Sequence, residues 1–290
     1  MTPVELRWAD AWATPHDVPQ YVRSVKAAKW DDFEASVRRA EPSVVRTMVD
    51  SIIAGDAWIL KGAFTPDYMR EMRERCVTWC RTRHESFHQI LDGVPDFHRN
   101  VNFEASKKYS IRHCRQSAYF FPWNDDPLGI LEEIMKRWRV IKIALGMGEH
   151  CFEGNIPSTG MTDRVQIARY LPKIGYIEPH RDAYQAQPCF ISGYMSTRGK
   201  DYTGGGYYFV DKDCKAMIVE DAIEAGDMCI GHANLLHGVA PCDGEPDWNA
   251  TDGRWFLGLY SVPSDYQRER DTTKPEPIKV EGVIPEGAND

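Results

Sequence analysis

Residues 166–182 read Gln-Ile-Ala-Arg-Tyr-Leu-Pro-Lys-Ile-Gly-Tyr-Ile-Glu-Pro-His-Arg-Asp. The segment up to Tyr170 is rich in residues that favour a strand, and the proline and glycine after it predict a turn. His180 and Asp182 follow, two residues apart. Side chains two apart on an extended segment point the same way, so this imidazole and this carboxylate can bind one metal ion together. Alone the spacing is a weak signal, because this composition yields roughly one such pair by chance.

From about residue 165 onward, short runs rich in Ile, Tyr, Phe and Val alternate with Gly, Pro and Asp. Several short strands at such spacing are typical of an antiparallel sandwich or barrel. The predicted strands are 165–170, 189–196, 206–210, 217–220, 228–231, 238–240 and 255–262.

The N-terminal half has a different pattern, and about 1–150 is predicted to be mainly helical. The predicted helices are 31–39, 44–53, 65–83 and 128–145, and the apolar run 57–60 predicts a strand. The fold class is therefore α+β, with N-terminal helices packed on a β-sandwich core at about 160–265. The simplest organisation is a single domain over 1–270, and the aromatic-free segment 271–290 predicts a loose C-terminal tail.

Composition and sequence pattern indicate which partners and which cellular location to expect. The chain has 290 residues and a net charge of −8, and no long basic run suggests binding to nucleic acid. No segment approaches the roughly 20 apolar residues that a membrane span requires. The first residues lack the apolar core of a signal peptide, and the eight cysteines show no disulfide pattern. We therefore expect reduced thiols and a cytoplasmic location.

Three further motifs follow the His-x-Asp pair in order. A Gly-Gly-Gly turn at 204–206 leads into a predicted strand, His237 precedes Gly-Val-Ala-Pro, and Gly253-Arg254 opens the last strand. Together with the strand that ends in Tyr170, these motifs resemble the 2-oxoglutarate/Fe(II) oxygenase superfamily, and most closely its prolyl-hydroxylase-like branch. The resemblance covers 166–262, about a third of the chain. It is specific because five linked features match in the right order.

The resemblance implies a double-stranded β-helix, or jelly-roll, core and an Fe(II) site. The implied iron ligands are His180, Asp182 and His237. Arg254 matches the cation that pairs with the distal carboxylate of 2-oxoglutarate, and a guanidinium can hold a carboxylate by two parallel hydrogen bonds. Tyr170 and Tyr194 match positions whose hydroxyls contact the same cosubstrate.

By resemblance, we expect the protein to consume O₂ and 2-oxoglutarate, to release succinate and CO₂, and to hydroxylate or otherwise oxidise a C–H bond, with desaturation and ring formation as the alternatives to hydroxylation. The carboxylate of Asp182 favours hydroxylation over halogenation. A small-molecule substrate is expected, with a peptide side chain and a nucleotide as alternatives. The stretch 109–115 either offers cations to an anionic substrate or forms a solvated face. An insertion at 245–252 lengthens the gap between His237 and Arg254, and it is expected to be a surface loop or, alternatively, a lid.

Two alternatives stay open at this stage. His84-Glu85-Ser86-Phe87-His88 matches H-E-x-x-H, which on a helix would bind zinc and make the protein a metalloprotease. Against this alternative, Arg81 and Arg83 crowd the motif and no adjacent third ligand follows it. The other alternative is a non-catalytic β-sandwich binding module, which the intact set of implied ligands disfavours.

Overall fold

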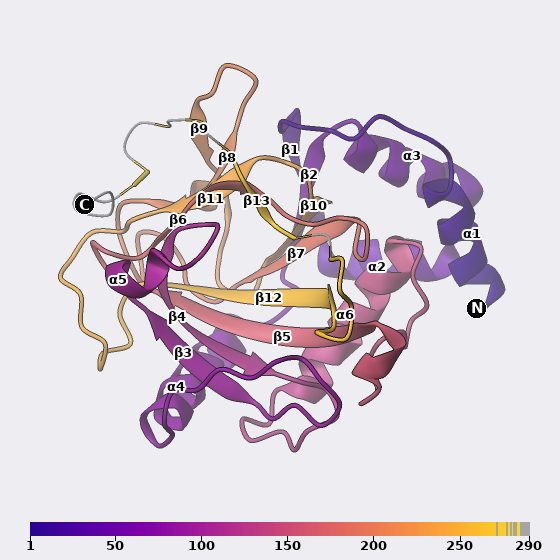
Figure 1. Cartoon of the computed structure of the whole chain (residues 1–290). Helices are drawn as coiled ribbons and strands as arrows, with labels where there is room; N and C mark the ends of the chain where they lie inside the picture. Colours follow the sequence, from indigo (N-terminus) through magenta and orange to yellow (C-terminus); the bar gives the residue numbers. More distant parts are fainter. Residues whose placement is uncertain (271, 277, 279, 281–282, 285–290) are drawn as a thin grey trace.

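The computed structural model describes residues 1–270, 272–276, 278, 280, 283 and 284. Its strands form one curled sheet in the order β1-β2-β10-β7-β12-β5-β4-β6-β11-β8-β9, with β3 added to β4 and β13 to β6 (Figure 1). The strands are β1 (Ser24–Lys29), β2 (Asp56–Lys61), β3 (Phe97–Val101), β4 (His113–Phe120), β5 (Met161–Tyr170), β6 (Tyr176–Arg181), β7 (Cys189–Tyr194), β8 (Gly206–Val210), β9 (Ala216–Ile218), β10 (Met228–His232), β11 (His237–Ala240), β12 (Arg254–Pro263) and β13 (Lys274–Pro275).

The sheet folds over at β4, which pairs with β5 through 116–120 and with β6 through His113 and Cys114. Its two halves face each other and share an apolar interior. Phe190 of β7 packs on Phe209 of β8, with their ring centroids 5.9 Å apart. Two packed half-sheets of this kind constitute a jelly roll, so the predicted fold class is confirmed.

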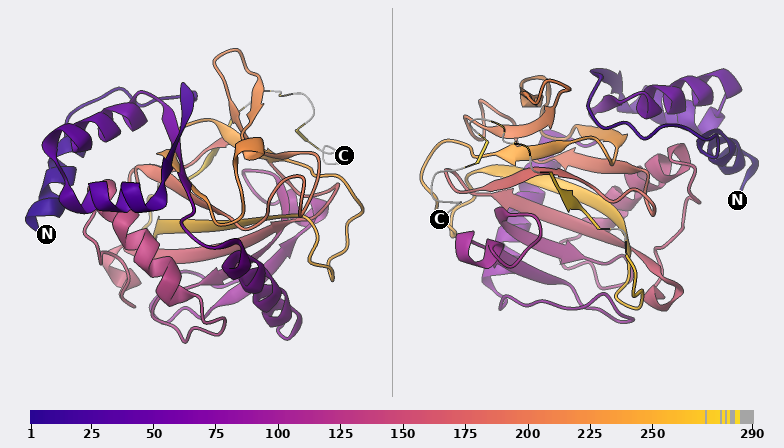
Figure 2. Two further views of the ribbon diagram at one scale, coloured as in Figure 1. Left: turned by 180° about the vertical axis from the view of Figure 1, so that it is seen from behind. Right: turned by 45° about the horizontal axis from the view of Figure 1, so that its top comes forward.

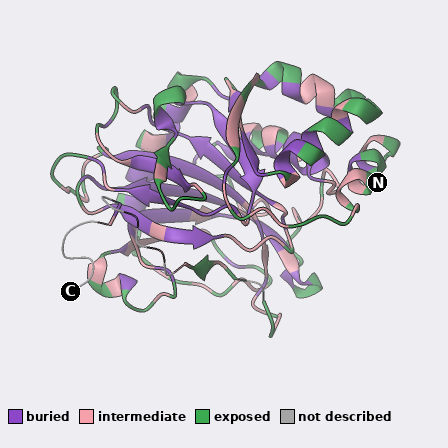
Figure 3. Ribbon diagram, turned by 90° about the horizontal axis from the view of Figure 1, so that it is seen from above, coloured by how far each residue is buried: buried purple, intermediate pink, exposed green. Residues whose placement is uncertain are grey.

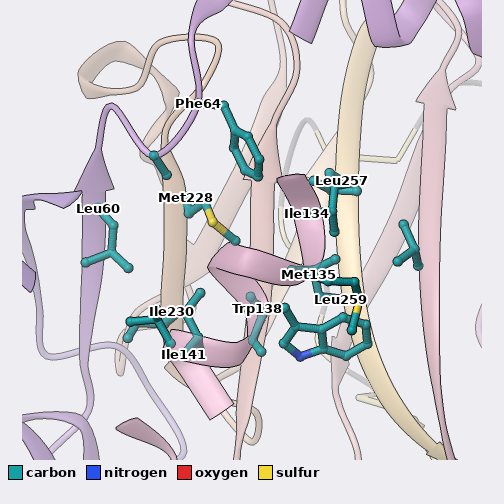
Figure 4. Close-up of a cluster of buried hydrophobic side chains, with 14 of the residues drawn as sticks. Leu60, Phe64, Ile134, Met135, Trp138, Ile141, Met228, Ile230, Leu257 and Leu259 are labelled. Carbon is teal, nitrogen blue, oxygen red and sulfur yellow. The ribbon is translucent and has the colours of Figure 1, made fainter. Parts of the chain in front are cut away.

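The helices are α1 (Pro3–Trp12), α2 (Trp30–Arg39), α3 (Pro42–Ile53), α4 (Pro66–Arg81), α5 (Phe103–Ser106) and α6 (Leu131–Ala144). All of them except the short α5 cover the outer face of the larger half-sheet (Figure 2), and α5 lies beside β3 and β4. In the close-up of Figure 4, Trp138 of α6 lies among side chains from the strands, including Leu259 of β12 and Ile230 of β10. These residues are fully buried, and the burial that Figure 3 shows is concentrated along the strands.

Side chains of β12 point alternately into this core and into the interior of the jelly roll. Leu257 and Leu259 belong to the cluster under the helices, whereas Arg254 and Phe256 line the cavity between the half-sheets. Because strand residues point alternately to opposite faces, one strand serves both the core and the site.

Most predicted elements correspond to observed ones, but the N-terminal half was predicted incompletely. It contains the expected α2, α3, α4 and α6, and also four strands, β1 to β4, of which only β2 was predicted. The prediction for 1–150 thus missed strands rather than helices, and among the missed strands is β4, which joins the two half-sheets. β6 was not among the predicted strands, although an extended segment was expected for His180 and Asp182.

The predicted tail begins with β13, where Lys274 and Pro275 pair with Arg181 and His180 of β6. The remainder of 271–290 lies largely outside the described residues, so its looseness stays a prediction. No helix in the described part of the chain is long and apolar enough to cross a membrane.

Candidate active site

The two half-sheets place three potential metal ligands together. His180 of β6 lies directly opposite His237 of β11 in the antiparallel register, and Asp182 follows β6. The Nε2 atoms of His180 and His237 lie 3.6 and 3.7 Å from different oxygens of the Asp182 carboxylate. All three ligand atoms lie within 4.8 Å of one another, which is close enough for one ion.

The orientation of both imidazoles suits metal binding. The Nδ1 atom of His180 lies 2.8 Å from the carbonyl oxygen of Glu178, and that of His237 lies 2.8 Å from that of Leu235. A carbonyl can only accept, so each Nδ1 carries the proton and donates, which leaves the Nε2 lone pair free for a metal. Burial lowers the pKa of His180 to about 4, with His237 acting in the same direction. His180 is therefore neutral at pH 7, as a ligand must be.

Backbone and tail contacts hold Asp182 in place. Its N–H donates to the carbonyl of Ala233 at 3.0 Å, and the Thr273 hydroxyl donates to its carboxylate at 3.3 Å. The segment just before β13 therefore reaches the predicted metal site.

Arg254 is buried at the start of β12, and Glu220 is its charged partner. Its Nε lies 2.5 Å from a Glu220 oxygen, and both side chains are 2 % exposed. The Tyr202 hydroxyl donates to the same carboxylate. Gly206 allows this arrangement, because its φ is 112° and a Cβ there would lie only 2.4 Å from Glu220 Oε2. The Gly-rich turn recognised in the sequence thus makes room for the partner of Arg254.

The other two nitrogens of Arg254, Nη1 and Nη2, are buried and have no partner among the described residues. The Tyr207 hydroxyl is likewise unpaired, and that of Tyr194 has only the Cys229 thiol, a weak acceptor, beside it. Burial raises the pKa of both tyrosines well above the ordinary value, so both keep their protons and can donate. A buried group of donors without acceptors is suited to an anion.

The predicted tyrosines are not equally well placed. The guanidinium carbon of Arg254 lies 5.4, 5.7 and 5.9 Å from the ring centroids of Tyr170, Tyr194 and Tyr207. Tyr170 and Tyr207 line the cavity, whereas Tyr194 is not among its described lining residues. Tyr207 was missed by sequence reasoning. The strand period would have indicated it, since it occupies the first inward position after the glycine turn.

A cavity of about 650 Å³ connects these groups. Its described walls include His180, Asp182, His237 and Arg254. The insertion 245–252 is not part of the described lining and lies on the outside of the sheet. There Arg169 donates to the carbonyl oxygens of Asp247 and Asp252, each at 2.7 Å. The insertion is thus a loop fastened to the surface.

The H-E-x-x-H sequence does not form a zinc site. Helix α4 ends at Arg81, and 84–89 has no regular secondary structure, so the two histidines do not share a helix face. Glu85 accepts hydrogen bonds from Asn100 at 2.8 and 2.6 Å. In the part of the chain that the structure describes, only His180, Asp182 and His237 form a cluster able to hold a metal. The metalloprotease alternative is therefore wrong.

The fold and the site define a class: a jelly-roll protein with a His-Asp-His metal-binding cluster inside the roll. No protein-family model matches the sequence, and no curated protein matches it. Solved structures do match. A prolyl hydroxylase from Trichoplax adhaerens, in complex with a hypoxia inducible factor peptide fragment, aligns over 80% of this chain and 90% of its own. The sequence identity is 12% and the TM-score 0.50.

Two other solved structures align over similar lengths. A prolyl-4-hydroxylase from Pseudomonas putida covers 75% of this chain and 98% of its own, at 14% identity and a TM-score of 0.48. A dioxygenase for auxin oxidation from rice covers 83% and 84%, at 10% identity and a TM-score of 0.47. The similarity to the Trichoplax enzyme is one of fold, and it shows that this chain shares the fold of that prolyl hydroxylase.

Proposed function

We propose that this protein is an Fe(II)- and 2-oxoglutarate-dependent oxygenase that hydroxylates a C–H bond of a small organic molecule. One observation carries the proposal: a single cavity contains both a three-ligand metal cluster and a buried guanidinium with two unpaired nitrogens. The metal cluster suits iron, and the guanidinium of Arg254 suits the free carboxylate of the cosubstrate.

The ligand set fits Fe(II). Two imidazoles and one carboxylate are the donors of non-haem iron sites that leave coordination positions open for other ligands. Each histidine already donates its Nδ1 proton to a backbone carbonyl, so no rearrangement is needed to present Nε2 to the ion. His180, Asp182 and His237 would hold the iron.

The Arg254 site fits 2-oxoglutarate. Burial alone would lower the pKa of Arg254, but Glu220 and the surrounding tyrosines raise it, so the side chain stays charged. Glu220 occupies Nε and fixes the plane of the guanidinium, which leaves Nη1 and Nη2 for a carboxylate. The Tyr207 hydroxyl, and more weakly those of Tyr170 and Tyr194, would add donors to the same group.

Iron and 2-oxoglutarate, when bound, supply the oxidising chemistry, with succinate and CO₂ as co-products. The protein chain itself positions the metal, the cosubstrate and the substrate. His180, Asp182 and His237 fix the metal, Arg254 fixes the cosubstrate, and the cavity wall determines which C–H bond faces the metal. Asp182 keeps the carboxylate position filled, which favours hydroxylation.

The test is to measure succinate formed from 2-oxoglutarate by anaerobically purified protein after addition of Fe(II) and O₂. We expect O₂-dependent formation of succinate by the protein without substitutions (the parent), and none by the His180→Ala or His237→Ala variant. His232→Gln is the matched control, since His232 is also buried but lies outside the cluster. Succinate from both ligand variants at the parental rate, or none from a parent that binds Fe(II), would refute the proposal.

A further inference from the structure

Two arginines on the cavity wall have no charged partner. Arg115 of β4 and Arg164 of β5 both line the cavity that contains the metal cluster. Each is partly buried, and the Nε atom of each is buried without a hydrogen-bond partner among the described residues. Burying a cationic donor without an acceptor costs free energy, so such groups call for a ligand that supplies one.

Neighbouring arginines show how this chain normally satisfies a buried guanidinium. Arg254 pairs with Glu220, and Arg169 donates to backbone carbonyls of the 245–252 loop. By contrast, Arg115 donates to the neutral hydroxyl of Tyr170 at 3.0 Å. Arg164 has neither a hydrogen bond nor an ion pair within the described residues. Arg115 and Arg164 therefore differ from Arg254 and Arg169, because neither has an anionic or carbonyl acceptor among the described residues.

Aromatic rings hold Arg164 in place without neutralising it. Its guanidinium carbon lies 5.0 Å from the ring centroid of Tyr119 and 5.4 Å from that of Tyr260. Contacts with ring faces leave the nitrogen donors at the guanidinium edge available to a ligand. Burial lowers the pKa of Arg164, and the nearby Arg115 cation acts in the same direction. An anion bound near both cations would offset the repulsion between them.

Arg164 is separate from the proposed 2-oxoglutarate site, whereas Arg115 borders that site through its hydrogen bond to the Tyr170 hydroxyl. In the β5–β12 register, Arg254 lies opposite Tyr170 and Arg164 lies opposite Tyr260. Tyr170 and Arg164 are six residues apart, which is roughly 20 Å along a strand. The acids among the described lining residues are Asp182, a proposed metal ligand, and the exposed Glu269. No buried carboxylate of the lining is thus free to neutralise these cations.

We propose that Arg115 and Arg164 bind the substrate, and that this substrate is a small organic anion bearing a carboxylate or phosphate group. The inference rests on the proposed function, since it names the substrate class of that oxygenase. The volume of the cavity, about 650 Å³, is in the range of small-molecule sites. Anchoring the anion on β4 and β5 would leave the rest of the molecule facing the metal cluster.

The experiment titrates phenylacetate, phenyl phosphate and neutral phenylacetamide into the full chain by anaerobic calorimetry, with Fe(II) and saturating 2-oxoglutarate present. Saturation with 2-oxoglutarate keeps the probes away from Arg254. We expect both anions to bind more tightly than phenylacetamide, and Arg115→Gln and Arg164→Gln each to weaken anion binding at least about tenfold. Arg70→Gln, on the exposed face of α4, should leave binding unchanged. The tighter anion identifies carboxylate or phosphate as the preferred group.

Salt dependence in the parent protein provides a measurement that does not depend on a variant folding. Anion affinity should fall as NaCl is raised, whereas any binding of phenylacetamide should not. Failure of the anions to bind at millimolar concentrations, equal binding of the neutral probe, or unchanged anion binding in both folded arginine variants would overturn the inference. Iron content and succinate formation test the proposed oxygenase function independently of anion binding. A failure of the substrate inference is therefore distinguishable from a failure of the proposed function.

Discussion

The imidazole rings of His180 and His237 lie opposite each other on adjacent antiparallel strands, with their centroids 4.4 Å apart. Each ring donates its Nδ1 proton to the carbonyl two residues before it, so both Nε2 atoms turn toward Asp182. Strand pairing thus brings together residues that are far apart in sequence, and backbone carbonyls set their orientation.

Replacing Arg254 by Lys should impair use of 2-oxoglutarate while sparing the metal. Lysine keeps a positive charge near Glu220 but loses the planar fork, so the KM for 2-oxoglutarate should rise about tenfold or more. Steady-state succinate assays measure this change, and Fe(II) content should stay at the parental value. An unchanged KM in a variant with normal iron would show that the cosubstrate carboxylate binds elsewhere.

Glu220→Gln should destabilise the protein by about 3 kcal/mol, because it leaves the buried cation of Arg254 without a counter-charge. Urea unfolding measures the loss. Saturating 2-oxoglutarate should recover more stability in this variant than in the parent, since its carboxylate would become the main partner of Arg254. Glu224→Gln is the control, because Glu224 is 60 % exposed and its pair with Lys200 contributes little. Equal recovery in variant and parent would argue against a carboxylate at Arg254.

Asp56 at the start of β2 should make stability depend on pH. Burial by itself raises its pKa, but hydrogen bonds from several donors lower it well below the ordinary value. The donors are Arg23, Lys26, Ser24 and Ser51. A lowered pKa in the folded state stabilises the protein above the unfolded pKa of about 4, and this stabilisation disappears as the pH falls below it.

Asp56→Asn should therefore cost about 1–3 kcal/mol at pH 7, and the difference from the parent should shrink as the pH falls below about 4. Chemical denaturation at a series of pH values tests this expectation. Asp50→Asn, in an exposed ion pair with Arg46, is the control and should change stability by no more than about 0.5 kcal/mol. A difference that stays constant with pH would contradict the role given to Asp56.

The strands after residue 165 could be predicted because their sequence alternates between apolar and turn-forming residues. β4 was missed because polar side chains such as Arg115, which lines the cavity, interrupt the apolar pattern. β6 was not among the predicted strands, although an extended segment was expected at His180 and Asp182. Its Pro179 cannot donate to a ladder. It is tolerated where the β6–β11 register shifts between His237 and Val239, since a bulge relaxes the pairing.

The potential metal ligands and Arg254 could be recognised from local motifs, since each lies next to a turn or strand with a distinctive sequence. Glu220 could not, because it pairs with a residue 34 positions away and only the folded sheet brings the two together. The H-E-x-x-H motif illustrates a related limit. A short pattern does not determine its own secondary structure, and here the helix ends before His84.

The most direct measurement is the amount of Fe(II) bound per chain by the parent and by His180→Ala, His237→Ala, His232→Gln and His84→Ala. It is made under anaerobic conditions, and circular dichroism confirms that each variant is folded. We predict one ion per chain in the parent and in the His232 and His84 variants, and little or none once His180 or His237 is lost. A parent that binds no Fe(II), or folded His180 and His237 variants that keep a full ion, would contradict the central claim.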